Sequence, residues 1–163
     1  MAVSAPEVWF YHLVQQAPER LLVDLLEKIL ARGWRAVVRL GDEAQVAAAS
    51  ERLWTYREDS FLPHGSAADG EAALQPIWIS AGPEIPNGAQ ILCLTAGGFC
   101  DLSAPPEGLA RICLLFQEAD EEALAAARGQ WRAAKAAGLK AVYWAETPEG
   151  GWIRKAEHDP AAG

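Results

Sequence analysis

Three side chains on one predicted helix have the types and the spacing of a small binding site. The segment 120–137 carries Arg128, Trp131 and Arg132, with Lys135 a further turn along. Because successive helical residues turn by about 100°, these four side chains fall on one stripe. Guanidinium groups bind carboxylates through two parallel hydrogen bonds, and an indole packs well against another ring. The stripe therefore predicts a pocket for an acidic segment that ends in an aromatic residue.

The other side of this helix holds residues with mostly small side chains: Ala123, Ala126, Ala127, Gln130, Ala133, Ala134 and Ala137. Small side chains let a helix lie close on a sheet, so we expect this side to face the core. Trp131 is then expected on the charged side, away from the core. The alternative is that Trp131 packs under a neighbouring loop while the cations stay solvated. The pattern alone leaves both interpretations open.

Residues that could perform covalent or metal chemistry are scattered along the chain. His12, His64 and His158 do not stand at metal-ligand spacing from one another or from cysteine. We expect His12 to be a hydrogen-bonded residue of the core or its rim, and His64 to order its own turn. Ser60 and Ser66 lie outside the G-x-S-x-G pattern of a catalytic serine.

Nucleotide-binding motifs are also missing from the sequence. It contains neither G-x-x-x-x-G-K-S/T nor a G-x-G-x-x-G that joins a strand to a helix. The pair Gly97-Gly98 follows a predicted strand, but short glycine pairs usually serve turns. Asp101 and Glu107 could form a carboxylate pair, although loop acids are usually only solvated. We therefore predict a protein that is not an enzyme and that holds no cofactor or metal.

The composition bounds the class of protein. A chain of 163 residues, 51% of them hydrophobic and 22% charged, is typical of one soluble globular domain. Its net charge of -8 argues against direct coating of DNA, because such proteins gain affinity from Lys and Arg that replace counterions. Cys93, Cys100 and Cys113 form no C-x-x-C pair, which favours buried free thiols. The sequence has no signal-peptide pattern and no membrane-length apolar run, so we expect a cytoplasmic protein without membrane contact.

The elements that must hold the 120–137 helix alternate along the chain. Apolar runs predict strands, and amphipathic segments with Pro18 or Asp42 at their start predict helices. The predicted strands are 8–14, 35–40, 76–80, 89–95, 111–116, 139–145 and 152–155, and the predicted helices are 18–32, 43–54 and 120–137. This order predicts a single α/β domain over residues 1–163, with a mostly parallel sheet and helices on both faces.

A second candidate binding segment follows the helix 43–54. It has the sequence L-W-T-Y-R-E-D-S-F-L-P-H-G over residues 53–65, and its aromatic residues include Trp54 and Phe61. Pro63 restricts Leu62 to an extended conformation, so a helix cannot continue through it. Trp54 and Phe61 either close the core or stand out as a docking site for a partner.

This segment resembles the chi subunit of the bacterial DNA polymerase III holoenzyme, through a tryptophan at the end of the second helix and S-F-L-P-H-G at 60–65. Further matches come in the same order: F-Y-H-L at 10–13, R-G-W-R-A at 32–36, Q-P-I at 75–77, A-R-G-Q-W-R at 127–132 and A-G-L after it. The resemblance covers residues 8–144, and 145–163 form a C-terminal extension. It implies a Rossmann-like fold used without a nucleotide.

The resemblance also implies two partner sites. In chi proteins, a basic and aromatic cluster on this helix receives the acidic, phenylalanine-ended C-terminal tail of single-stranded-DNA-binding protein. Here that cluster falls on Arg128, Trp131 and Arg132, and Gln117 falls where the family pocket has another wall residue. The second site, for the psi subunit of the clamp loader or for a helicase, falls on Trp54 and Phe61.

The residues and the resemblance predict a non-catalytic adaptor of the DNA polymerase III clamp loader. It would contact DNA only indirectly, through single-stranded-DNA-binding protein. Two alternatives remain open. One is a helicase-associated DNA repair accessory that uses Trp54 and Phe61, and the other is a small α/β enzyme that binds a nucleotide or a methyl donor.

Overall fold

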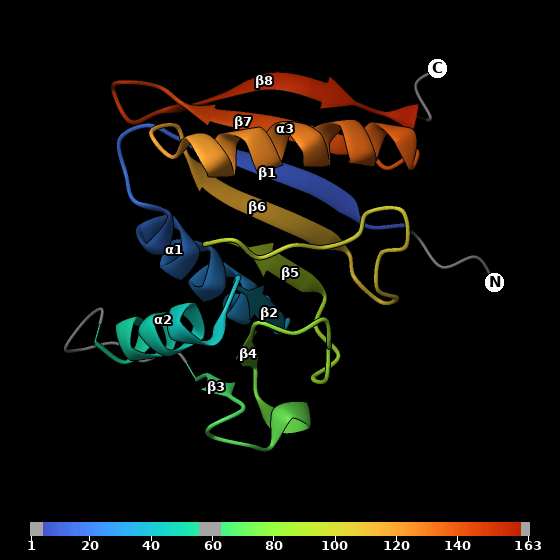
Figure 1. Cartoon of the computed structure of the whole chain (residues 1–163). Helices are drawn as coiled ribbons and strands as arrows, with labels where there is room; N and C mark the ends of the chain where they lie inside the picture. Colours follow the sequence, from blue (N-terminus) through green and yellow to red (C-terminus); the bar gives the residue numbers. More distant parts are fainter. Residues whose placement is uncertain (1–4, 56–62, 161–163) are drawn as a thin grey trace.

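The computed structural model describes residues 5–55 and 63–160, without the side chains of residues 54 and 55. Figure 1 shows the arrangement of its elements. In chain order they are β1 (Glu7–Leu13), α1 (Pro18–Ala31), β2 (Ala36–Arg39), α2 (Glu43–Thr55), β3 (Gly65–Ser66), the 3-10 helix η1 (Ala72–Leu74), β4 (Ile77–Ser80), β5 (Ile91–Leu94), β6 (Arg111–Gln117), α3 (Glu121–Ala136), β7 (Ala141–Glu146) and β8 (Trp152–His158). The predicted strands and helices are all present, while β3 and η1 were not predicted.

The strands form one sheet in the order β3-β4-β2-β5-β6-β1-β7-β8. Neighbouring strands from β3 to β7 are parallel, and only β8 runs antiparallel, beside β7. A parallel pair needs a crossover connection. The helices supply three such connections: α1 joins β1 to β2, α2 joins β2 to β3, and α3 joins β6 to β7. The predicted mostly parallel, Rossmann-like sheet is therefore confirmed.

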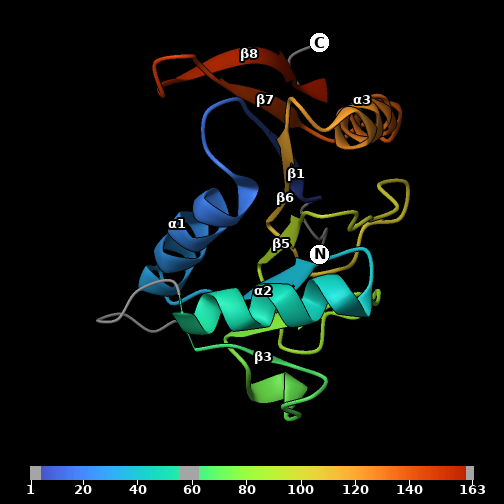
Figure 2. The same cartoon turned by 60° about the vertical axis from the view of Figure 1, so that its left-hand side comes forward.

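Helices cover both faces of the sheet, as predicted. α1 and α2 lie on one face and α3 lies on the other (Figures 1 and 2). β1 shows how the sequence serves both layers: Tyr11 and Leu13 pack on the α1 side, whereas Val8 and Phe10 pack on the α3 side. None of the helices in the described part of the chain has the length and apolar composition needed to cross a bilayer.

Local sequence signals fix the ends of α1 and α2. Pro18 occupies the first turn of α1, where its missing N–H costs no hydrogen bond. Gly33 follows the helix with a φ of 76°, a left-handed conformation that glycine adopts without strain. Before α2, the side chain of Asp42 accepts a hydrogen bond from the N–H of Gln45 over 2.9 Å.

The buried carboxylate of Glu146 holds the connection between β1 and α1. Its Oε1 accepts hydrogen bonds from the N–H groups of Val14, Gln15 and Gln16 over 2.9, 2.6 and 3.1 Å. Burial alone would raise the pKa of this carboxyl, but the three backbone donors outweigh burial and hold the pKa below its ordinary value. The end of β7 thus fixes the path by which the chain leaves β1.

Two backbone segments approach each other closely at the usual ligand crevice of this fold. β2 and β5 are neighbours whose chains continue in opposite directions, and ligands normally bind between such strand ends. The N–H of Gly41 donates to the carbonyl oxygen of Ala96 over 3.1 Å, and a Cβ on Gly98 would collide with the carbonyl oxygen of Arg39. Gly97 lies in the turn after β5, and the N–H of Gly98 donates to the carbonyl oxygen of Thr95, as the predicted turn role of Gly97-Gly98 requires.

The three cysteines are buried free thiols, as predicted. Cys93 and Cys113 lie opposite each other on β5 and β6. Their hydrogen bond and their burial raise the pKa of the Cys93 thiol. These thiols consequently act as small apolar residues of the core.

Replacing Glu146 by Gln tests the carboxylate that holds the β1-α1 connection. We expect a loss of about 1–2 kcal/mol in the free energy of unfolding at pH 7, because hydrogen bonds to a charged acceptor are the stronger ones. The pKa of Glu146 is lowered on folding, so its contribution is present above the unfolded-state pKa and is lost as pH falls through the folded-state pKa. Urea denaturation at pH 7 and at pH 3 measures both effects.

The matched control is Glu149→Gln, since Glu149 is exposed on the turn after β7. This control should change the free energy of unfolding by less than about 0.5 kcal/mol at either pH. A difference between wild type and Glu146→Gln that stays constant from pH 7 to pH 3 would contradict the role of the ionised carboxylate.

Candidate partner-binding site on helix α3

The ends of α3 are fixed by residues with capping side chains or left-handed backbone. The side chain of Asp120 accepts a hydrogen bond from the N–H of Ala123 over 3.1 Å and caps the first turn. Acidic residues occupy the first turn and Lys135 the last, which suits the helix dipole. Gly138, with a φ of 72°, follows the helix in the left-handed conformation. These features confirm the helix predicted at 120–137.

Small and polar side chains bring α3 close to the sheet. Ala127, Gln130 and Ala134 are its buried residues. The Nε2 group of Gln130 donates to the carbonyl oxygen of Cys100 over 3.0 Å, so this buried amide has a partner. Three of the seven residues on the predicted alanine side thus face the core as expected, while Ala126 and Ala137 are exposed.

Trp131 also lies on the core side, and the expectation that it points away from the core is wrong. Its ring packs edge-on against Phe10 of β1, with 5.4 Å between ring centroids, and against Tyr143 of β7, at 5.9 Å. Trp131 follows Ala127 by four residues, so its side chain is rotated by only about 40° around the helix axis from that of Ala127. The buried stripe of a helix is at least 100° wide and therefore includes both residues. The half-buried indole rests on strands and not under a loop.

Arg128 and Arg132 are exposed beside this indole, one helical turn apart. From residue 123 to residue 141 the chain contains four cations and no Asp or Glu, although its net charge is -8. Lys140 lies 4.0 Å from carboxylates of Glu7 and Glu157, whereas Arg128, Arg132 and Lys135 form no ion pair among the described residues. Such a surface attracts anions at distances within the Debye length, about 8 Å at physiological salt.

Tyr143 joins the site to a hydrogen-bond chain that runs through the buried His12 to the exposed Glu118. Burial raises the pKa of Tyr143, and the positive charge of Arg128 acts in the opposite direction. The Tyr143 hydroxyl donates to Nδ1 of His12 over 2.6 Å, and Nε2 of His12 donates to Glu118 over 3.3 Å. The prediction that His12 is a hydrogen-bonded core residue is confirmed. Tyr143 itself was missed, although its place beside Phe10 in the predicted parallel sheet was the available signal.

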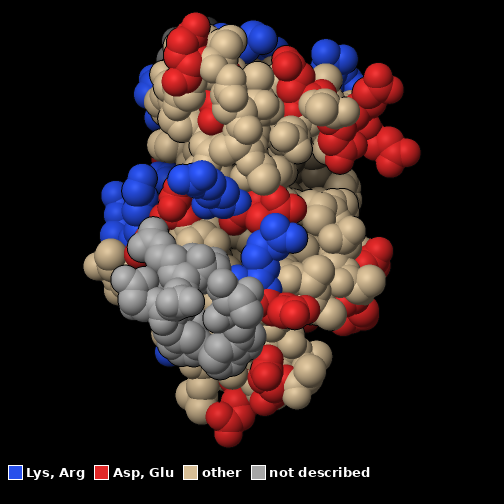
Figure 3. Space-filling model, turned by 90° about the vertical axis from the view of Figure 1, so that its left-hand side faces the viewer, with Lys and Arg blue, Asp and Glu red and all other residues tan. Residues whose placement is uncertain are grey.

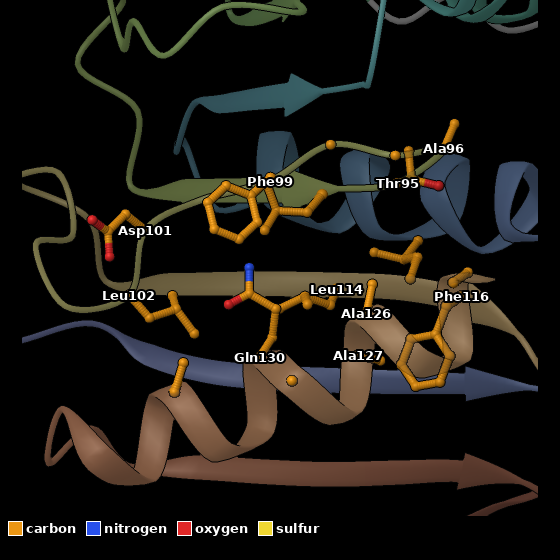
Figure 4. A pocket seen from close by; sticks show the side chains of 17 residues that line it. Thr95, Ala96, Phe99, Asp101, Leu102, Leu114, Phe116, Ala126, Ala127 and Gln130 are labelled. Atoms are coloured by element: carbon orange, nitrogen blue, oxygen red, sulfur yellow. The ribbon is translucent and has the colours of Figure 1, made fainter. Parts of the chain in front are cut away.

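On its other side, α3 borders a cavity of about 350 Å³. Figure 4 shows Gln130 pointing from α3 toward segment 94–102, with Leu114 and Phe116 of β6 on the cavity wall. The cavity exists because alanines and Gly129 leave space beside the helix. Asp101 is its only charged lining residue among those described, so this side does not suit an acidic ligand.

Residues 5–142 match the family model described as "DNA polymerase III chi subunit, HolC". This chain belongs to the DNA polymerase III chi subunit family. The match includes all of α3. It covers nearly the same range as the resemblance over 8–144 and confirms that resemblance. A protein of Rickettsia prowazekii (strain Madrid E) named "Probable DNA polymerase III subunit chi" is 32% identical over 84 residues, 52% of this chain. The alignment covers 51% of that protein, so this chain matches about half the length of its relative.

Gln117 is not brought to the α3 cluster in this chi-family chain. It ends β6 next to Phe116, and neighbouring strand residues point to opposite faces of a sheet. Phe116 packs on the α3 side, so Gln117 points away from it. Gln117 instead lines a cavity of about 580 Å³ with the acidic residues Glu19, Asp120 and Glu122. Its assignment to the tail pocket gains no support from this geometry.

The second predicted partner site falls mainly outside the described residues. Trp54 belongs to the last turn of α2, but its side chain and the whole of Phe61 are not among the residues described. A psi or helicase site on these residues stays a prediction. His64, just after this segment, is buried, with its Nε2 3.2 Å from the carbonyl oxygen of Ser50. This contact fixes the chain against α2, as expected of a residue that orders its own segment.

The loop acids considered as a catalytic pair have separate surroundings. Oδ1 of Asp101 accepts hydrogen bonds from the hydroxyl and the N–H of Ser103, over 2.6 and 3.0 Å. These bonds lower the pKa of Asp101, which is exposed. Asp101 thus stabilises its own turn, and its hydrogen bonds among the described residues go to Ser103 and not to the exposed Glu107.

Replacing Trp131 by Ala tests the packing that holds the site together. We expect a loss of about 2–4 kcal/mol in the free energy of unfolding, because Phe10 and Tyr143 lose an aromatic contact and a void remains. Arg132→Ala, one residue along and exposed, should change stability by less than about 0.5 kcal/mol. Urea denaturation of both variants measures the difference, and equal small losses would show that Trp131 does not pack as described.

Proposed function

We propose that this chi-family chain is a non-catalytic adaptor of the DNA polymerase III clamp loader in DNA replication. It would act in the cytoplasm by binding the acidic C-terminal tail of single-stranded-DNA-binding protein through Arg128, Trp131 and Arg132. The observation that carries this proposal is the half-buried Trp131 flanked by two exposed guanidinium groups on a stretch without acids. Family membership supports the polymerase context.

The chemistry of the three side chains suits a tail that ends in a ring and a carboxylate. Guanidinium groups one turn apart can hold the terminal carboxylate and an upstream acidic side chain, each through paired N–H donors. The outer part of the indole offers an apolar wall to the terminal ring, while Phe10 and Tyr143 keep the indole in place. A rigid apolar wall lowers the entropic cost of binding.

We assign the clamp-loader side of the adaptor to the segment with Trp54 and Phe61, as the family resemblance implies for psi or for a helicase. The basis is the position of Trp54 in the last turn of α2, away from α3 in the chain. The two partner sites would then be on different elements. One protein could therefore hold both partners at once, which an adaptor requires.

The competing proposal of a small enzyme with a nucleotide or methyl-donor ligand receives less support. Such enzymes of this fold class bind their ligand between diverging strand ends. In this chain the backbones of Gly41 and Gly98 meet neighbouring backbone at that position, which leaves less room for a phosphate. The adaptor proposal needs no ligand there.

A labelled peptide of acidic residues ending in Pro-Phe and a free carboxylate tests the proposal by fluorescence anisotropy. Arg128→Ala should weaken binding roughly tenfold, since a charge-assisted hydrogen bond is lost. Binding should also weaken as salt rises from 0.1 M to 1 M, where the Debye length falls from about 10 Å to about 3 Å.

Two controls sharpen this experiment. Lys135→Ala removes a cation from the next turn and should weaken binding less than Arg128→Ala. The C-terminally amidated peptide should bind less tightly than the free acid, because its terminal charge is gone. Equal binding of the two peptides, or no loss with Arg128→Ala, would mean that α3 presents only a solvated helix surface.

A further inference from the structure

A second cationic site lies on the opposite face of the sheet from α3. A cavity of about 510 Å³ separates the C-terminal half of α1 from the first residues of β1 and β6. Its lining combines three aromatic side chains with three cations: Trp9, Tyr11, Trp34, Lys28, Arg32 and Arg111. Pockets of this size accommodate small ligands, and aromatic walls with a few polar groups are typical of them.

The charge of this cavity is opposite to that of the protein. The lining includes three cations and no Asp or Glu, in a chain of net charge -8. Lys28, Arg32 and Arg111 form no ion pair with any carboxylate in the described part of the chain. Figure 3 shows Lys and Arg side chains, with Asp and Glu between them, across the middle of one face of the molecule. Lys28 and Arg32 are exposed residues of α1. Cations that lack an internal partner favour an external anion.

Indole rings hold two of these cations in fixed positions. The guanidinium carbon of Arg111 lies 3.9 Å from the ring centroid of Trp9, and that of Arg32 lies 5.2 Å from the ring centroid of Trp34. Stacking leaves the N–H edges of a guanidinium group available for an anion.

We propose that this cavity binds one nucleotide, with its phosphate on the cations and its base against the indole and guanidinium planes. A phosphate monoester carries a charge near -2 at neutral pH, which three cations without an ion pair in the described part of the chain can balance. Bases stack on aromatic rings and on guanidinium planes. The C-terminal end of α1 repels anions, so side chains must supply the attraction here.

The floor of the cavity favours a nucleotide over a peptide. β1 and β6 are interior strands, each hydrogen-bonded to a neighbour on both sides. Their backbone groups are therefore already paired, and a buried peptide would leave its own amides without partners. A nucleotide needs only the side chains that line the cavity.

This site departs from the expectation that the protein contacts DNA only indirectly and binds no nucleotide. That expectation rested on missing phosphate-loop motifs and on the net charge. The cavity lies near the first residues of β1 and β6, whereas the crevice with Gly41 and Gly98 lies at the ends of β2 and β5. A free nucleotide and the 5′ end of a single strand carry the same phosphate and base, so either source fits the proposal.

Nuclear magnetic resonance of the indole N–H groups tests this proposal on the full chain. Thymidine 5′-monophosphate and 5′-phosphorylated oligothymidylate are titrated separately, and signals of Trp9 and Trp34 are identified with Trp→Phe variants. We expect saturable shifts of these two signals, with thymidine, which lacks the phosphate, binding roughly tenfold more weakly. Tighter binding of the oligonucleotide would identify a single strand as the source, and equal binding a free nucleotide.

Variants separate this site from the tail site. Arg111→Gln and Lys28→Gln should each weaken nucleotide binding severalfold, and Lys28, exposed on α1, can be replaced without disturbing the core. Arg132→Gln on α3 is the matched control and should leave nucleotide binding unchanged. Binding of the acidic tail peptide should in turn be unaffected by Lys28→Gln, so the two proposals fail independently.

Three results would overturn the nucleotide site. One is the absence of saturable shifts with both phosphorylated probes, and another is equal binding of thymidine and its monophosphate. The third is displacement of the Trp9 and Trp34 signals by an acidic peptide at lower concentration than by either nucleotide, which would make the cavity a peptide site.

Discussion

The packing of Trp131 against Phe10 and Tyr143 is the contact on which the candidate site depends. It sets the rotation of α3 about its own axis, and with it the direction of every other side chain on the helix. Arg128 and Arg132 reach solvent at the edge of the indole because Ala127 and its small neighbours fill the space beneath. Phe10 and Tyr143 meet because they are register partners on adjacent parallel strands. The site therefore requires the β6-β1-β7 order that the α3 crossover creates.

Much of the fold could be predicted because its signals are local. Pro18 and Gly33 bound α1, Asp120 and Gly138 bound α3, and an apolar run identifies β6. β3 could not be predicted, since two residues become a strand only by pairing with β4. The close backbone approach at the crevice likewise depends on Gly41 and Gly98 meeting backbone from distant parts of the chain.

The position of Trp131 could not be predicted from helical periodicity alone. Helical spacing gives the angle between two residues, but it does not give the direction of the core. The alanine-rich side suggested one direction, and the actual buried stripe lies between that side and the cations. The rings that decide the question come from β1 and β7, far from α3 in sequence. Residue types at the site could thus be predicted, while their orientation needed the tertiary structure.

Although the net charge of the protein is -8, two regions on opposite faces of the sheet carry several cations. Over the short range of electrostatic forces in salt solution, a ligand responds to nearby charges and not to the total.

A crystal structure of the protein with the acidic tail peptide bound would test the proposed α3 site. Our account predicts the terminal carboxylate within hydrogen-bond distance of Arg128 or Arg132 and the terminal ring on Trp131, which stays packed on Phe10 and Tyr143. A peptide bound elsewhere, such as in the cavity beside Arg111, with the α3 face empty, would contradict it.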